Sequence, residues 1–114
     1  MDYKTARNFL IDQGLALETQ RNPDAFLIRL KQGNAPIPGQ VTNILLALKV
    51  AFDTLQEAPM LDRQLVYALH LFAVESVRQF EAGSRSGTAW PPVLKEDVNR
   101  IAIAVKNIFS GVWQ

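Results

Sequence analysis

The chain has 114 residues, of which 48% are hydrophobic and 20% are charged, and 12 basic residues nearly balance 11 acidic ones. This is the composition of one globular domain with a core of its own. The formal charge of +1 excludes a global attraction to nucleic acid or to anionic membranes. The sequence has no run of about 18 apolar residues, so it predicts no membrane span. The absence of cysteine excludes disulfides, thiol catalysis and cysteine–metal sites, and it agrees with a cytoplasmic location.

The first third of the chain predicts two short helical pieces. Asp2 is a good cap for the first piece, which either continues through Gly14 or, as we expect, breaks or kinks there. The second piece has Asn22 as its predicted cap, Pro23 as its first residue and Gly33 as its end. The basic residues of this third exceed the acidic ones by one, which is too little for a nucleic-acid footprint, although the spacing imitates a helix-turn-helix.

Three longer amphipathic helices follow, predicted over residues 39–57, over residues 62–83 and from Pro91–Pro92 to about Phe109. Their apolar stripes recur at helical spacing and are Val41, Ile44, Leu45, Leu48, Phe52 and Leu55; Leu65, Val66, Leu69, Phe72, Ala73, Val77 and Phe80; and Leu94, Val98, Ile101, Val105 and Ile108. No alternating run predicts a strand. The sequence therefore predicts an all-α fold, with residues 1–114 forming one small bundle of four to five helices.

The connector "GSRSGTAWPP" (83–92) has the glycines and the threonine of a phosphate loop but no lysine, and it follows a helix instead of a strand. We therefore interpret it as a mobile linker in which Gly83 ends the preceding helix. Trp90 has two interpretations, either a staple against the bundle at the entry to the last helix or a residue that contacts a partner.

No group of side chains in the sequence predicts a catalytic or metal-binding site. His70 is the only histidine, so we expect it to be half-buried and hydrogen-bonded instead of catalytic or metal-binding. The serines have no recognisable base, and the acidic pairs resemble solvated helix faces. We therefore expect no catalytic residue, no cofactor and no metal.

Apolar residues outside the stripes are the main anomaly. Tyr67, Leu71 and Val74 lie opposite the main stripe of their helix, and the tail adds Val112 and Trp113. A helix that is apolar on two sides is either central in a fold or part of an interface. These five residues, with His70 and Trp90, are the interaction candidates, and the sequence leaves open whether they are interface or internal core.

The stretches "NPDAFLIRLKQGNAPIPGQVTNILLALKVAF" (22–52) and "IFSGVWQ" (108–114) carry a resemblance. They are similar to a group of small all-helical cyanobacterial proteins of unknown function, some of which carry the name dethiobiotin synthetase. The resemblance covers the whole chain and implies a cytoplasmic, cyanobacterial setting and no catalytic residues. The enzyme of that name resembles a P-loop α/β protein, and this chain has neither the strand–loop–helix nor the phosphate-binding lysine of that fold.

We therefore expect a non-catalytic protein–protein interaction or regulatory domain that forms a homodimer or binds a protein partner. One alternative is a small-molecule binding module with a cavity between the three long helices, near His70 or Trp90. A second alternative is an enzyme of unrecognised type.

Overall fold

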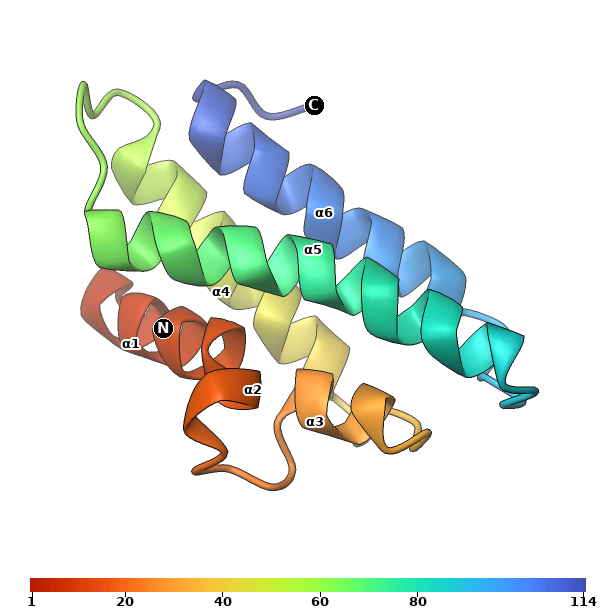
Figure 1. Cartoon of the computed structure of the whole chain (residues 1–114). Helices are drawn as coiled ribbons and strands as arrows, with labels where there is room; N and C mark the ends of the chain where they lie inside the picture. Colours follow the sequence, from red (N-terminus) through yellow and green to blue (C-terminus); the bar gives the residue numbers. More distant parts are fainter.

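The computed structural model describes all 114 residues and contains helices without strands, which confirms the predicted all-α bundle (Figure 1). The helices are α1 (Tyr3–Gly14), α2 (Ala16–Thr19), α3 (Phe26–Lys31), α4 (Gln40–Leu55), α5 (Arg63–Arg85) and α6 (Leu94–Ser110). There are six helices instead of four to five because the first predicted piece divides after Gly14, where a single turn, α2, follows.

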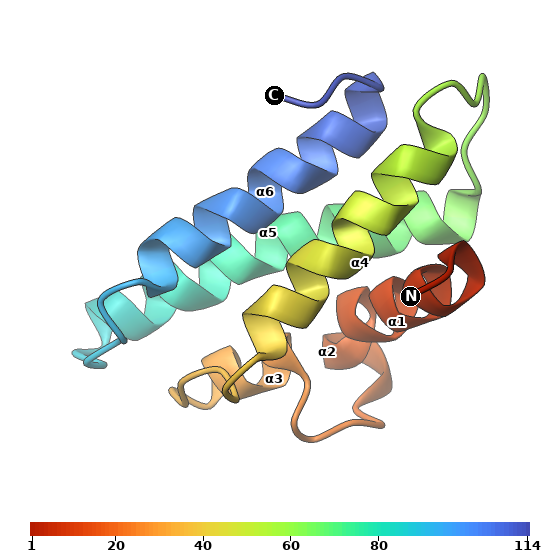
Figure 2. The ribbon, with the colours of Figure 1, turned by 180° about the vertical axis from the view of Figure 1, so that it is seen from behind.

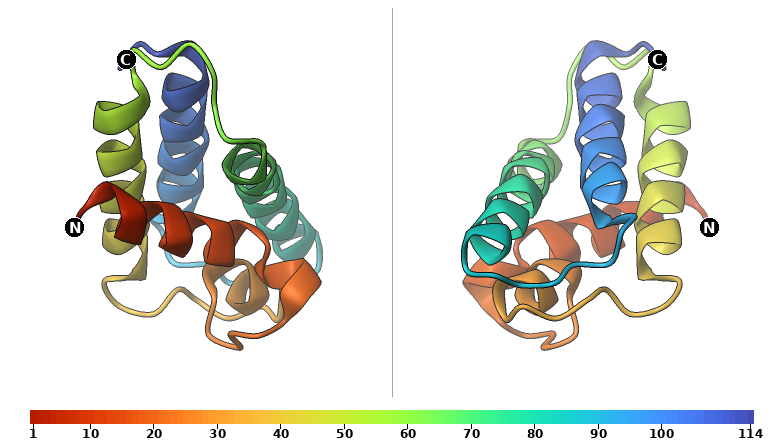
Figure 3. Two further views of the ribbon diagram at one scale, coloured as in Figure 1. Left: turned by 90° about the vertical axis from the view of Figure 1, so that its left-hand side faces the viewer. Right: turned by 90° about the vertical axis from the view of Figure 1, so that its right-hand side faces the viewer.

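The three long helices determine the architecture. Helices α4 and α6 lie side by side and run in the same direction, while α5 runs in the opposite direction behind them (Figure 2). Helix α1 crosses the bundle and packs against both α4 and α5, as the end-on views show, and α3 packs against α5 (Figure 3). One face of the α4–α6 pair is therefore left without a covering helix.

The core lies where the stripes of the long helices meet α1 and α3. Leu48, Phe52, Leu69, Phe72, Ile101 and Val105 are all buried, as their stripes predict. Phe26 of α3 contributes one of the largest buried side chains, and its ring lies 6.0 Å from the ring of Phe72. Helices α1 and α3 thus complete the core by packing against α4 and α5, while the other face of the α4–α6 pair stays uncovered.

The break at Gly14 is confirmed, and a close approach between helices explains why this residue is glycine. Gly14 does not adopt a left-handed conformation. A Cβ atom at this position would lie 2.2 Å from the backbone oxygen of Ala68 on α5. Glycine is therefore required here because α1 crosses α5 at backbone distance.

The predicted start of the second helical piece, which corresponds to α3, is wrong. Asn22 caps a turn, with its side-chain oxygen accepting from the amide of Asp24 at 3.1 Å, and α3 begins three residues after Pro23. The buried side chain of Gln13 takes over part of the capping, because its Oε1 accepts from the amide of Phe26 at 3.2 Å. A cap supplied by another helix cannot be recognised from the local sequence.

The predicted end of α5 at Gly83 is also wrong, because the helix continues to Arg85. The left-handed residue that follows the helix is Gly87, with φ of +84°, and the amide of Thr88 donates back to the carbonyl of Gly83 at 2.9 Å. The connector is thus tied to the helix end, in contrast to the mobile linker that we predicted.

No helix combines the length and the apolar character that crossing a membrane requires.

Candidate functional site: the groove between α4 and α6

The uncovered side of the α4–α6 pair carries a groove with two pockets that follow one another along the helices. The N-terminal pocket, of about 320 Å³, lies between the first turns of α4 and α6, and the C-terminal pocket, of about 340 Å³, lies beside the tail. Leu45 and Arg100 line both pockets, so the two hollows adjoin each other. We call this surface the α4–α6 groove.

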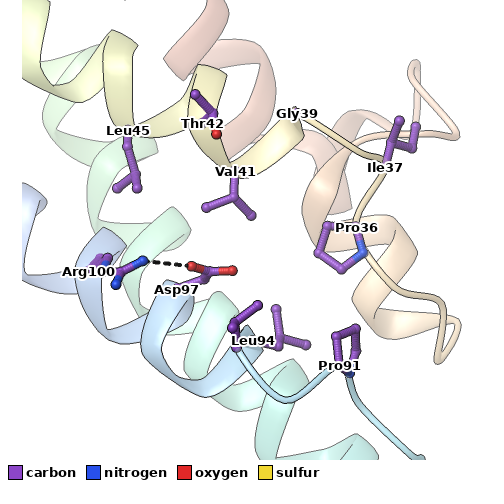
Figure 4. Close-up of a pocket in the computed structure, with 11 residues that line it drawn as sticks. Pro36, Ile37, Gly39, Val41, Thr42, Leu45, Pro91, Leu94, Asp97 and Arg100 are labelled. Atoms are coloured by element: carbon purple, nitrogen blue, oxygen red, sulfur yellow. Dashed lines mark hydrogen bonds and ion pairs between the residues drawn. The ribbon is translucent and has the colours of Figure 1, made fainter.

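The N-terminal pocket is built by the loops that lead into the two helices (Figure 4). Gly39, with φ of +83°, turns the chain into α4, and Leu94 begins α6 with its amide donating to the carbonyl of Pro91 at 3.0 Å. The apolar walls are Pro36, Ile37, Val41, Leu45, Pro91, Val93 and Leu94. The polar side is an ion pair in which Arg100 donates to Asp97 at 3.2 Å.

The C-terminal pocket is bounded by the tail, which folds back over the end of the groove. Gly111, with φ of +76°, reverses the chain after α6. The ring of Trp113 then packs edge-on against Phe52 with 5.0 Å between centroids, and the Lys49 ammonium lies 4.3 Å above the Trp113 ring. In its hydrogen-bonding orientation the buried amide of Asn107 donates to the carbonyl of Val112 at 3.3 Å.

Large apolar side chains lie in solvent within the groove or next to one of its lining residues. Leu46 on α4 is 47% exposed, Ile103 on α6 is 42% exposed, and Trp113 is 44% exposed even after packing on its own chain. The exposed side chain of Val93 adds an apolar group at the N-terminal end. The groove therefore combines exposed apolar side chains at both ends with a charged pair, Asp97 and Arg100, on its α6 side.

The α5 candidates lie on the opposite side of the molecule from this groove (Figures 1 and 2). The hydroxyl of Tyr67 donates to the carboxylate of Glu18, which ties α5 to the turn of α2. Val74 is 37% exposed and Leu71 is half-buried. His70 is exposed and has no hydrogen-bond partner, so the expectation that it is half-buried and hydrogen-bonded is wrong.

Trp90 packs against its own chain, as the staple interpretation expects. Its ring stacks on Phe80 at 6.2 Å, and its indole Nε1 donates to the carbonyl of Phe80 at 3.0 Å. The ring also lies against Gly83, where a Cβ atom would be 2.3 Å from its edge. Gly83 therefore makes room for Trp90 instead of ending α5.

The sequence reasoning missed how the groove is assembled. Leu45 and Arg100 line it from two helices, and only the parallel pairing of α4 with α6 brings them together. The usable signal was the apolar character of Leu46 and Ile103 outside their stripes, and of the tail beyond them. That signal identified exposed apolar positions without showing that they share one surface.

Four groups have a shifted pKa, and each lies outside the groove. A backbone hydrogen bond from Thr5 lowers the pKa of Asp2, and burial raises the pKa of Tyr3. The hydrogen bond from Arg7 lowers the pKa of Asp62, and the hydrogen bond to Glu18 raises the pKa of Tyr67. These pKa shifts have local structural causes. No group of three or more histidine, aspartate or glutamate side chains is arranged to hold a metal ion.

The five principal pockets of the surface lie between pairs of elements or on loops. None of them is lined by α4, α5 and α6 together, and neither His70 nor Trp90 lines any of them. The cavity that the small-molecule alternative places between the three long helices is thus not among these pockets.

Comparison with known proteins adds no relative: no family model matches the chain, and no curated protein or solved structure matches it at a significant level.

Proposed function

We propose that the chain is a non-catalytic interaction domain that binds protein through the α4–α6 groove. The observation that carries this proposal is the pair of adjoining pockets between α4 and α6, beside which the large apolar side chains of Leu46, Ile103 and Trp113 stay exposed. Contiguous exposed apolar surface of this kind marks sites of protein association.

The shape of the groove favours a protein partner over a small ligand. The lining residues on α6 run from Leu94 to Asn107, so the groove extends over about 20 Å at ~1.5 Å per residue. It is open along this length, whereas small-molecule sites enclose most of their ligand. Trp113, half-covered by Phe52 and Lys49, has the character of the aromatic anchors that dominate binding energy in protein interfaces.

The setting of this function remains a prediction from the sequence. A cytoplasmic location follows from the resemblance to small helical cyanobacterial proteins and agrees with the absence of cysteine.

Site-specific photo-crosslinking tests the proposed function. A photoreactive residue at position 46, an exposed position next to the lining residue Leu45, should form adducts with protein in the native cell. The same residue at position 74 is the matched control, because Val74 is also an exposed apolar residue on a long helix but belongs to α5, and it lines neither pocket of the groove. Equal adduct formation at both positions, or none at position 46, would contradict the proposal.

A further inference from the structure

We infer that the partner binds the α4–α6 groove through a short extended segment in which an acidic side chain is flanked by apolar ones, and that Lys49 and Arg100 bind the acid. The inference rests on the proposed function, because it states the chemistry of the protein that the groove binds. The charges and the apolar walls of the two pockets support it.

The first argument is the charge of the C-terminal pocket. Lys49 of α4 and Arg100 of α6 line this pocket, and no acidic residue is among its lining residues. Both cations are partly accessible, with 45% of the Lys49 side chain and 58% of the Arg100 side chain exposed. Two cations without a facing acid fit one carboxylate of a partner, which is the charge complementarity that orients a bound protein.

The ion pairs that these cations already make leave room for a further carboxylate. Lys49 pairs with Asp53 at 3.0 Å. Arg100 pairs with Asp97 at 3.2 Å and with Glu96 at 3.5 Å. Such pairs within one exposed helix are weak, and a guanidinium has five N–H donors, so both cations can take another acceptor. Of the three acids only Asp97 lines the groove, and it lines the N-terminal pocket, so the partner carboxylate belongs in the C-terminal pocket.

The second argument is the apolar surface on both sides of the charged region. Ile103 and Trp113 line the C-terminal pocket and stay exposed. Val41 and Leu94 line the N-terminal pocket, and Arg100 lines both pockets where they adjoin. Alternate side chains of an extended segment lie on one face and enter successive pockets. The pattern apolar–x–acidic–x–apolar spans ~13 Å at ~3.3 Å per residue, which fits within the groove.

NMR titration with short peptides tests the inference. The probe is acetyl-Leu-Ser-Glu-Ser-Leu-Ser-amide, and the same peptide with Gln or Lys in place of Glu is the matched control. The Glu peptide should shift the indole N–H signal of Trp113, which lines the C-terminal pocket. It should leave the signal of Trp90 unchanged, because Trp90 donates to Phe80 and lines neither pocket. The Gln peptide should bind about fivefold more weakly at low salt, and added salt should reduce this difference by screening the charges.

Charge removal in the protein tests the two cations. In Lys49→Gln and in Arg100→Gln the preference for the Glu peptide over the Gln peptide should fall to about twofold or less. Lys106→Gln should keep the preference, since Lys106 is an exposed base of α6 that lines neither pocket. The preference is a ratio measured on one variant, so a lower fraction of folded protein weakens both peptides equally and leaves the ratio unchanged. Circular dichroism of each variant checks the fold directly.

The failures are distinguishable. Equal binding of the Glu and Gln peptides, or stronger binding of the Lys peptide, overturns the acidic chemistry. A shift of the Trp90 signal instead of the Trp113 signal places the peptide outside the groove and overturns the inference. The inference is also overturned if no peptide shifts Trp113, or if the protein sediments as a dimer and the Glu peptide does not compete with self-association. Adducts at position 46 would then leave the proposed function in place, with a partner of other chemistry or a second copy of the chain in the groove.

Discussion

Individual residues in this fold are fixed by close packing more than by local propensity. Gly14 is required because Ala68 leaves no space for a side chain, and Gly83 is required because Trp90 occupies that space. In both cases the residue that leaves no space for a side chain lies on another helix or later in the chain. The sequence shows the glycine but not its neighbour, so a glycine that allows close approach was interpreted as a helix end at position 83.

Gly14→Ala is expected to destabilise the protein. Helix propensity alone predicts a gain of about 0.5–1 kcal/mol on replacing glycine by alanine in a helix. The clash with the oxygen of Ala68 opposes this gain, and overpacking of this kind costs ~1–3 kcal/mol. Urea unfolding decides the sign, with Asn8→Ala on the exposed side of the same helix as a control that should change little.

Leu69→Ala should lower the free energy of unfolding by ~2–5 kcal/mol, because it removes fully buried methyl groups and leaves a cavity. Leu46→Ala is the matched control, since Leu46 is also a helical leucine but lies on the surface. A loss below about 1 kcal/mol for Leu69→Ala in urea unfolding would show that the assigned core stripe of α5 is wrong.

At the scale of elements, the sequence predicted the three long helices well and the short N-terminal ones less well. Asp62 and Gly111 are local signals that mark the start of α5 and the end of α6, and the structure agrees with both. The start of α3 depends on Gln13, which belongs to α1, so no local signal could place it. The groove was beyond sequence reasoning because it needs the parallel pairing of α4 with α6.

The link between α1 and α5 makes stability depend on acid pH. Arg7 Nε donates to Asp62 at 2.6 Å, and this hydrogen bond holds the pKa of Asp62 below its usual value of 3.8. A lowered folded-state pKa contributes stability above the unfolded-state pKa, and this contribution is lost as the pH falls through the folded-state pKa.

Asp62→Asn isolates this link, because asparagine is also a good helix cap. At neutral pH the variant should be less stable by ~0.2–1 kcal/mol, the range of partly exposed ion pairs. The difference from wild type should narrow as the pH falls from 3.8 through the lower pKa of folded Asp62, where its carboxylate becomes protonated. Urea titrations across pH measure it, and a difference that persists unchanged at pH 2 would contradict the assigned role of the pair.

At the scale of the whole molecule, the chain forms one compact body in which α1 joins α4 to α5 and α6 closes the other side. The Cα radius of gyration of 13.6 Å is close to the ~13 Å typical of a compact domain of about 100 residues. One continuous core contains residues of every long helix and of α1 and α3. Such a body should unfold in a single cooperative transition.

The two tryptophans test this cooperativity from opposite ends of α6, since Trp90 precedes the helix and Trp113 follows it. Trp90→Phe leaves only the probe at the tail, and Trp113→Phe leaves only the probe at the α5–α6 connector. In each variant the urea midpoint from tryptophan fluorescence should coincide with the midpoint from circular dichroism, because both tryptophans pack on the same core. If the Trp113 signal instead changed before the helices unfold, the tail would be a separate unit held mainly by Phe52, Lys49 and Asn107. Its contacts with the core would then be weaker than those of Trp90, whose ring stacks on Phe80 and donates a hydrogen bond to its carbonyl.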